Sequence, residues 1–142
     1  MKSSICTIFG FIGGTIASLF GGWDAALITL IIFMVIDYIT GVIVAGVFHK
    51  SRKSENGALE SGAGWKGLCR KGVILLFVLV ACRLDLIMGI TFIRDTVIIG
   101  FIINEGISIT ENAACMGVPL PAIITKALEI LKKNNDNQTL EE

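Results

Sequence analysis

The chain has 142 residues, of which 54% are hydrophobic and only 17% are charged, and its mean hydropathy is +0.78. This composition excludes an ordinary soluble domain and predicts an integral membrane protein with room for one domain. The formal net charge is zero, so the overall charge gives no attraction to nucleic acid. The cysteines are too widely spaced for a zinc site or a disulfide framework, and we interpret them as small apolar side chains.

Four apolar segments approach the length of about 20 residues that a helix needs to cross a membrane. They are residues 4–22, 25–48, 72–93 and 96–118. We therefore predict an all-α integral membrane domain over residues 1–133, with four hydrophobic helices or, as the alternative, three. Around these helices we expect a cytoplasmic loop at residues 49–71, a short amphipathic interfacial helix at 121–133 and a disordered tail at 134–142.

Small residues recur every four positions in the first segment, at Gly10, Gly14, Ser18 and Gly22. Such a stripe allows helix backbones to approach closely in lipid. Gly41 and Ala45 repeat the spacing in the second segment, and we predict that both sets pack helices together. The alternative for the first segment is a flexible N-terminus at the membrane interface. A cleaved signal peptide is disfavoured, because the segment lacks a good cleavage site.

The four segments differ in how well each would insert into lipid alone. Segment 25–48 carries many strongly apolar residues and one charge, Asp37, so its insertion is favourable by roughly 3 kcal/mol. In segment 72–93 the apolar residues favour insertion equally, but Arg83 and Asp85 cancel most of this free energy of insertion. Segment 96–118 is unfavourable alone because it contains glutamates and asparagines. The third and fourth helices are therefore expected to need contacts with neighbouring helices in order to insert into the membrane.

Basic residues predict the orientation of the chain in the membrane. They gather in the loop and in the C-terminal region, at Lys50, Arg52, Lys53, Lys66, Arg70, Lys71, Lys126, Lys132 and Lys133. With four crossings these residues share one side with Lys2, and only Arg94 lies between the third and fourth segments. Because positive loops stay in the cytoplasm, we expect both termini to be cytoplasmic.

Two charges inside the apolar segments are expected to lie at the same depth. Asp37 lies 11 residues before Phe48, and Arg83 lies 11 residues after Gly72. At the helical rise per residue both are then roughly 17 Å from the connecting loop. Charges within a membrane seek an opposite partner or a water-filled path, so we predict that Asp37 and Arg83 pair or face the same path. The alternative is that the third helix ends at Arg83, which then extends to the interface.

The fourth segment carries a polar stripe. On a helix, Asn104, Glu105, Ser108, Glu111 and Asn112 fall within an arc of about 120°. A helix too polar to insert alone suggests association with other helices around a polar lumen. The same periodicity also fits an amphipathic helix on the membrane surface. Pro119 and Pro121 then end this helix and start another.

Enzymatic motifs are lacking in the sequence. "GAGWKG", residues 62–67, has the spacing of a dinucleotide-binding loop, but it follows a charged loop and precedes an apolar segment instead of joining a strand to a helix. No phosphate-binding loop, zinc-protease motif or serine–histidine–acid arrangement is credible with the single histidine, His49. We expect a protein that is not an enzyme and has no cofactor and no metal.

Three motifs together resemble one family. They are Asp37-x-x-Thr40-Gly41, then Ser61-x-x-Gly64-x-x-Gly67-x-x-Arg70-Lys71, and finally Glu105-x-x-Ser108-Ile109-x-x-Asn112 followed by Gly117-x-Pro119-x-Pro121. Their order and spacing over residues 10–131 are similar to those of the phage lysis and toxin-secretion holins of Gram-positive hosts. Gly62 departs from this pattern, which has a second serine beside Ser61, and the N-terminal glycine stripe belongs to only some members.

The resemblance implies a non-enzymatic protein of the bacterial cytoplasmic membrane. Such a protein forms homo-oligomers among the lipids and opens a lesion through which an endolysin or a toxin leaves without being stably bound. Two alternatives stay open. An antiholin-like regulatory subunit shares the same composition, and a small multidrug transporter has a similar size, although we expect a glutamate in the first span of such a transporter.

Overall fold

The computed structural model describes residues 2–53, 55–58 and 60–140, and in these residues every regular element is helical. The elements are α1 (Lys2–Leu19), α2 (Ala25–Ile43), a π-helical continuation of α2 named η1 (Val44–Phe48), α3 (Ser61–Met88), α4 (Ile93–Cys115) and α5 (Ala122–Leu140). The all-α class predicted from the sequence is therefore confirmed.

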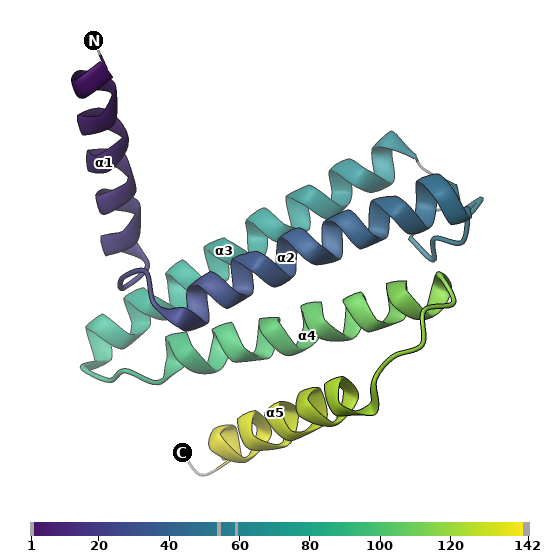
Figure 1. Ribbon diagram of the computed structural model, residues 1–142. Helices are drawn as coiled ribbons and strands as arrows, with labels where there is room; N and C mark the ends of the chain where they lie inside the picture. The colour runs from purple at the N-terminus through teal and green to yellow at the C-terminus, as the bar shows by residue number, and fades with distance from the viewer. Residues whose placement is uncertain (1, 54, 59, 141–142) are drawn as a thin grey trace.

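Helix α4 lies at the centre of the arrangement, where it contacts α2, α3 and α5. Figure 1 shows that α3, α4 and α5 each run antiparallel to the helix before them in the chain, whereas α1 points away from the other helices. Gly106 lets α5 approach α4 closely, since a Cβ at this position would lie 2.6 Å from Leu128 Cδ2. The bundle proper is thus formed by α2 to α5.

The faces that α2, α3 and α4 turn toward one another follow the helical repeat. The apolar core consists of Leu27, Leu30, Met34, Ile74, Val78, Ile98 and Ile102. The same three- and four-residue steps lead from this core to Asp37 on α2, to Lys71 on α3 and to Glu105 on α4, all of them buried. The inward stripe is therefore apolar in its middle and charged at its end near the loop.

Large apolar side chains cover much of the outer surface. On α2 and α3 the exposed ones include Ile28, Ile32, Val35, Ile39, Val73, Leu76, Phe77 and Val80. A bundle that pairs a few charges inside a mainly apolar core and exposes apolar side chains on α2 and α3 is suited to lipid. By length and composition one helix of the described residues, Ala25–Phe48, can cross a membrane, and the apolar helix Ser4–Leu19 is shorter. The four crossings remain a prediction.

Two boundaries differ from the expected ones. Residues 61–71, predicted as part of the loop, form the first turns of α3. Glycine lowers the helix propensity of this segment, but the continuous helix that follows and the contacts of the folded chain outweigh this cost. Residues 134–140, predicted as a disordered tail, continue α5, where Gly100 of α4 lies close to Asn135. The rest of that tail, residues 141–142, lies outside the described residues.

The small residues predicted to pack helices fall into two groups. A Cβ placed on Gly10 or Gly14 of α1 would have no atom within 4 Å, so in a single chain this stripe faces no neighbour. Gly22 has a φ of 108° and belongs to the turn after α1. By contrast, Gly41 faces Asn112 of α4, and Ala45 is buried. Only the second group packs helices within one chain.

Candidate functional site

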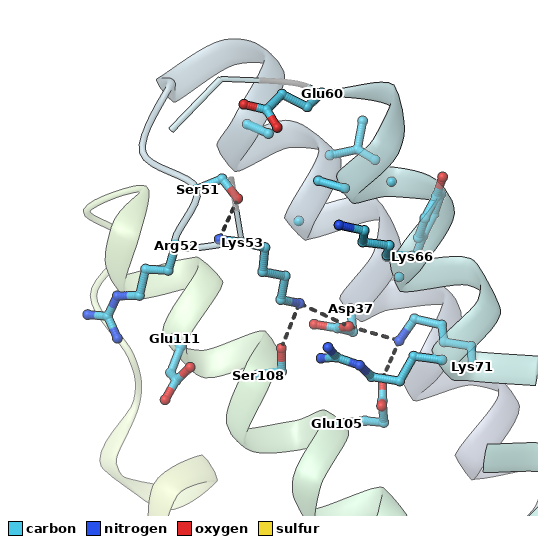
Figure 2. A pocket seen from close by; sticks show the side chains of 18 of the residues that line it. Asp37, Ser51, Arg52, Lys53, Glu60, Lys66, Lys71, Glu105, Ser108 and Glu111 are labelled. Carbon is cyan, nitrogen blue, oxygen red and sulfur yellow. Dashed lines mark hydrogen bonds and ion pairs between the residues drawn. The ribbon is translucent and has the colours of Figure 1, made fainter. Parts of the chain in front are cut away.

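Lys71 lies between two carboxylates that come from different helices. Its Nζ donates to Asp37 Oδ2 of α2 at 2.8 Å and also to Glu105 Oε2 of α4. The three side chains are only 11%, 7% and 5% exposed, respectively. Figure 2 shows them converging at the bottom of a pocket. Because isolated buried charges are strongly unfavourable, this contact holds α2, α3 and α4 in one register.

A second lysine reaches this site from the connection between η1 and α3. Lys53 Nζ lies 3.6 Å from Asp37 Oδ2 and donates to Ser108 Oγ at 3.3 Å. Its side chain is 49% exposed, so Lys53 covers the buried ion pairs from the solvent side (Figure 2). Two lysines thus balance Asp37 and Glu105, and the cluster of these four residues is formally neutral.

Asn112 orients the carboxylate of Asp37. Its Nδ2 donates to Asp37 Oδ1 at 3.2 Å and lies 2.9 Å from Thr40 Oγ1, one turn farther along α2. The hydroxyl of Thr40 in turn donates to the Ile36 carbonyl at 2.9 Å. Both oxygens of Asp37 therefore have donors, which is the arrangement that a buried carboxylate requires.

Above the ion pairs lies a polar pocket of about 550 Å³. The end of α2, η1, the connection, the first turns of α3 and the middle of α4 all line it. The motif residues Gly64, Gly67, Arg70 and Lys71 are part of this lining, whereas Ser61 begins α3 outside it. The second motif of the sequence therefore forms a pocket wall instead of a loop.

The pairing predicted between Asp37 and Arg83 is not present. Arg83 is exposed, and its Nη2 donates to the Leu19 carbonyl at the end of α1, at 3.2 Å. The depth expected for Arg83 takes Gly72 as the start of the third helix, but α3 starts at Ser61. Counted from this start, Lys71 lies about 15 Å from the loop, which matches the depth of Asp37. The sequence predicts Arg83 in place of Lys71 as the partner of Asp37 because it predicts too late a start for the third helix.

The polar stripe of α4 is partly buried within one chain. Glu105 and Asn112 are buried, while Asn104, Ser108 and Glu111 are more exposed. Four of these residues line the pocket, and Asn112 packs just beneath it against α2. Between the stripe and α5, the break predicted from Pro119 and Pro121 lies between Cys115 and Ala122. A polar lumen shared by several chains remains a prediction.

A second charged site lies at the opposite end of the helices. Arg94 is buried, and its Nη1 contacts Asp24 Oδ2 at 2.6 Å and Asp95 Oδ1 at 2.9 Å. Its Nε donates to the Phe20 carbonyl at 2.6 Å. From α3, Asp85 accepts hydrogen bonds from the backbone N–H groups of Ile93 and Arg94 and so caps α4. The sequence alone indicates Arg94 only as a charge between two helices.

Asp24 connects this second site to the start of α2. Its Oδ1 caps the helix by accepting from the Leu27 N–H at 2.9 Å. The hydrogen bond from Arg94 holds the pKa of the Asp24 carboxyl below its ordinary value. A lowered pKa in the folded state means that the ionised carboxyl contributes to stability above its unfolded pKa of about 3.9. This contribution is lost as the pH falls through the folded-state pKa.

We predict that Asp24→Asn lowers the stability at neutral pH, because asparagine keeps a cap oxygen but loses the ion pair. The difference from the unmodified chain should begin to shrink as the pH falls below about 3.9, where the Asp24 carboxyl of the unfolded chain takes up a proton, and should vanish only below the lowered folded-state pKa. Unfolding in detergent at a series of pH values measures this difference. A difference of equal size at pH 7 and pH 3 would contradict the electrostatic explanation.

Comparison with known proteins identifies relatives. A family model described as the bacteriophage holin family matches residues 14–133. An uncharacterized protein of Clostridium perfringens (strain 13 / Type A) is 40% identical over 136 residues, which cover 93% of this chain and 95% of that protein. The probable holin of Bacillus phage phi105 is 38% identical over 111 residues, covering 78% of this chain and 76% of the phage protein. No solved structure matches the chain.

The matched residues run from α1 to α5 and contain both charged sites described above. The match confirms the family that the three sequence motifs resemble. The chain belongs to the bacteriophage holin family.

Proposed function

We propose that this chain is a holin, which accumulates in the cytoplasmic membrane of the host, self-associates and opens a lesion. Through this lesion an endolysin, or in a toxin-release system a toxin, leaves the cell. The observation that carries the proposal is the match to the bacteriophage holin family over residues 14–133. Family membership also indicates a non-enzymatic role and the cytoplasmic membrane as the site of action.

The distribution of polarity supports this proposal. The neutral cluster of Lys53, Lys71, Asp37 and Glu105 is enclosed by helices whose outer faces are apolar. A single chain therefore pairs its buried charges internally and can remain in lipid without conducting water. When several copies associate, the polar faces of α3 and α4 have an alternative environment, a water-filled space between chains. Association increases with the amount of protein in the membrane, so the lesion opens only after the protein has accumulated.

Inducible expression in a bacterial host, together with an endolysin that lacks its own signal sequence, tests the proposal. We expect respiration to stop abruptly and the endolysin to be released. Ile32→Asp is the control variant, because a charge on the exposed face of α2 offsets the roughly 3 kcal/mol that favour its insertion. Undisturbed growth at high membrane levels of the unmodified chain would refute the proposal.

The same experiment separates the two alternatives. An antiholin-like subunit would leave cells intact when expressed alone and would delay lysis by a co-expressed holin. A multidrug transporter would leave cells intact and raise their resistance to cationic drugs. Either result would replace the proposal with the corresponding function.

A further inference from the structure

We propose that α2 and the first half of α3 form a binding site for one anionic phospholipid. The headgroup lies at the basic rim of the polar pocket, and an acyl chain lies in a neighbouring apolar groove. This inference rests on the membrane location given under Proposed function, but it does not require that the chain form a lesion.

The apolar part of the site is a groove of about 440 Å³ between α2 and α3. Its lining is apolar except for Tyr38 and Lys71, and consists of Ile31, Met34, Val35, Tyr38, Ile39, Leu68, Lys71, Gly72 and Leu75. Tyr38 and Lys71 also line the polar pocket. A polar and an apolar cavity that meet at two residues match a ligand that has a charged head and a hydrocarbon tail.

The polar part of the site carries unpaired positive charge. Five basic and four acidic side chains line the pocket, which leaves one positive charge in excess. Lys53 and Lys71 are already paired with Asp37 and Glu105. Lys66 and Arg70 lie one helical turn apart on α3, and among the described residues neither forms an ion pair. These two cations are therefore available for a phosphate group.

With α3 placed across the bilayer, as the sequence predicts for its apolar part, the position of these cations along α3 fits the headgroup region. Helix α3 has 28 residues, so it is about 42 Å long, close to the roughly 40–45 Å of a bilayer with its headgroups. Lys66 and Arg70 then lie about 8–14 Å from the start of the helix, near the edge of the hydrocarbon layer, from which long basic side chains reach the headgroups. Trp65, which is 67% exposed, lies at the same level, as tryptophans at membrane interfaces do.

Glycine gives the headgroup access to the helix backbone. Gly67 lines the pocket between Lys66 and Arg70, and a Cβ at this position would have no atom within 4 Å. A free phosphate ion would use only the basic rim, whereas a phospholipid also fills the groove. The continuity of the two cavities therefore favours the lipid over the free ion.

Fluorescence quenching by brominated lipids tests the proposal. The chain contains two tryptophans, so Trp23→Phe leaves Trp65 as the only reporter. The protein is placed in phosphatidylcholine vesicles that contain either brominated phosphatidylglycerol or brominated phosphatidylcholine at equal amounts. We expect stronger quenching by the anionic lipid. Lys66→Gln with Arg70→Gln should reduce this preference about fivefold for each lost charge, to the level of non-selective contact.

Three further measurements assign the source of the selectivity. Lys126→Gln with Lys132→Gln removes two exposed cations of α5 that do not line the pocket, and should leave the preference unchanged. Gly72→Leu fills the groove, where a Cβ meets no atom within 4 Å, and should weaken lipid binding without disturbing the fold. Added inorganic phosphate should not remove the preference.

Equal quenching by both lipids, or a preference that persists without Lys66 and Arg70, would overturn the proposal. Loss of the preference in inorganic phosphate, together with no effect of Gly72→Leu, would also overturn it and indicate a site for the free ion. Binding is measured in vesicles without any lysis. A chain that binds the lipid but fails to release endolysin would therefore refute the proposed function and leave the lipid site in place.

Discussion

Replacing Lys71 with methionine should lower the free energy of unfolding by about 3–5 kcal/mol, the cost of removing one partner from a buried ion pair. Methionine fills a similar volume but leaves Asp37 and Glu105 close together, with only the half-exposed Lys53 to balance them. Denaturant titration of the purified chain in mixed micelles, followed by circular dichroism, measures the loss. This variant breaks the buried ion pairs that join α2, α3 and α4 near the loop.

Two control variants separate the buried charge from the substitution itself. Lys66→Met makes the same change at an exposed position one to two turns earlier on α3 and should alter stability little. Adding Asp37→Asn and Glu105→Gln to Lys71→Met removes the uncompensated carboxylates and should restore most of the lost stability. If the triple variant is as unstable as Lys71→Met alone, packing of the lysine stem is what matters, and the ion-pair explanation is wrong.

Arg94→Gln should release the connection between α1 and α2 from the rest of the bundle. The guanidinium of Arg94 is bonded to the Phe20 carbonyl and to Asp24, and glutamine is too short to reach both. Because the carboxylates of Asp24 and Asp95 are about half exposed, water compensates them, and the expected loss is about 1–3 kcal/mol. Chymotrypsin should then cut after Phe20 and Trp23 faster than in the unmodified chain.

Arg83→Gln is the matched control for this prediction. Arg83 also donates a hydrogen bond to the end of α1, at the Leu19 carbonyl, but it is exposed and makes no other hydrogen bond to the described residues. Its replacement should leave the rate of chymotrypsin cleavage nearly unchanged. If cleavage is accelerated equally in both variants, the loss of any contact with the end of α1 is enough to expose the connection. The buried guanidinium of Arg94 then has no special role.

The helical class and the inward faces could be predicted because both follow from local spacing. Asp37, Glu105 and Asn112 were identified from the sequence as polar residues inside apolar segments, and all three are buried together. The role of Lys71 does not follow from the sequence in the same way, because residues 61–71 are rich in glycine and basic residues, a composition that predicts a loop. When the helix start is known to be Ser61, depth along the helix places Lys71 beside Asp37.

The sequence by itself determined which residues are polar within apolar helices, because hydropathy and helical repeat are local properties, and its motifs indicated the family. Only the tertiary structure decided the partners: Lys71 and not Arg83 for Asp37, and Asp24 with the Phe20 carbonyl for Arg94. The physical reason is that a charge pair depends on the ends, rotation and neighbours of two helices at once. An error of eleven residues in one helix end, such as Gly72 in place of Ser61, selects a different partner.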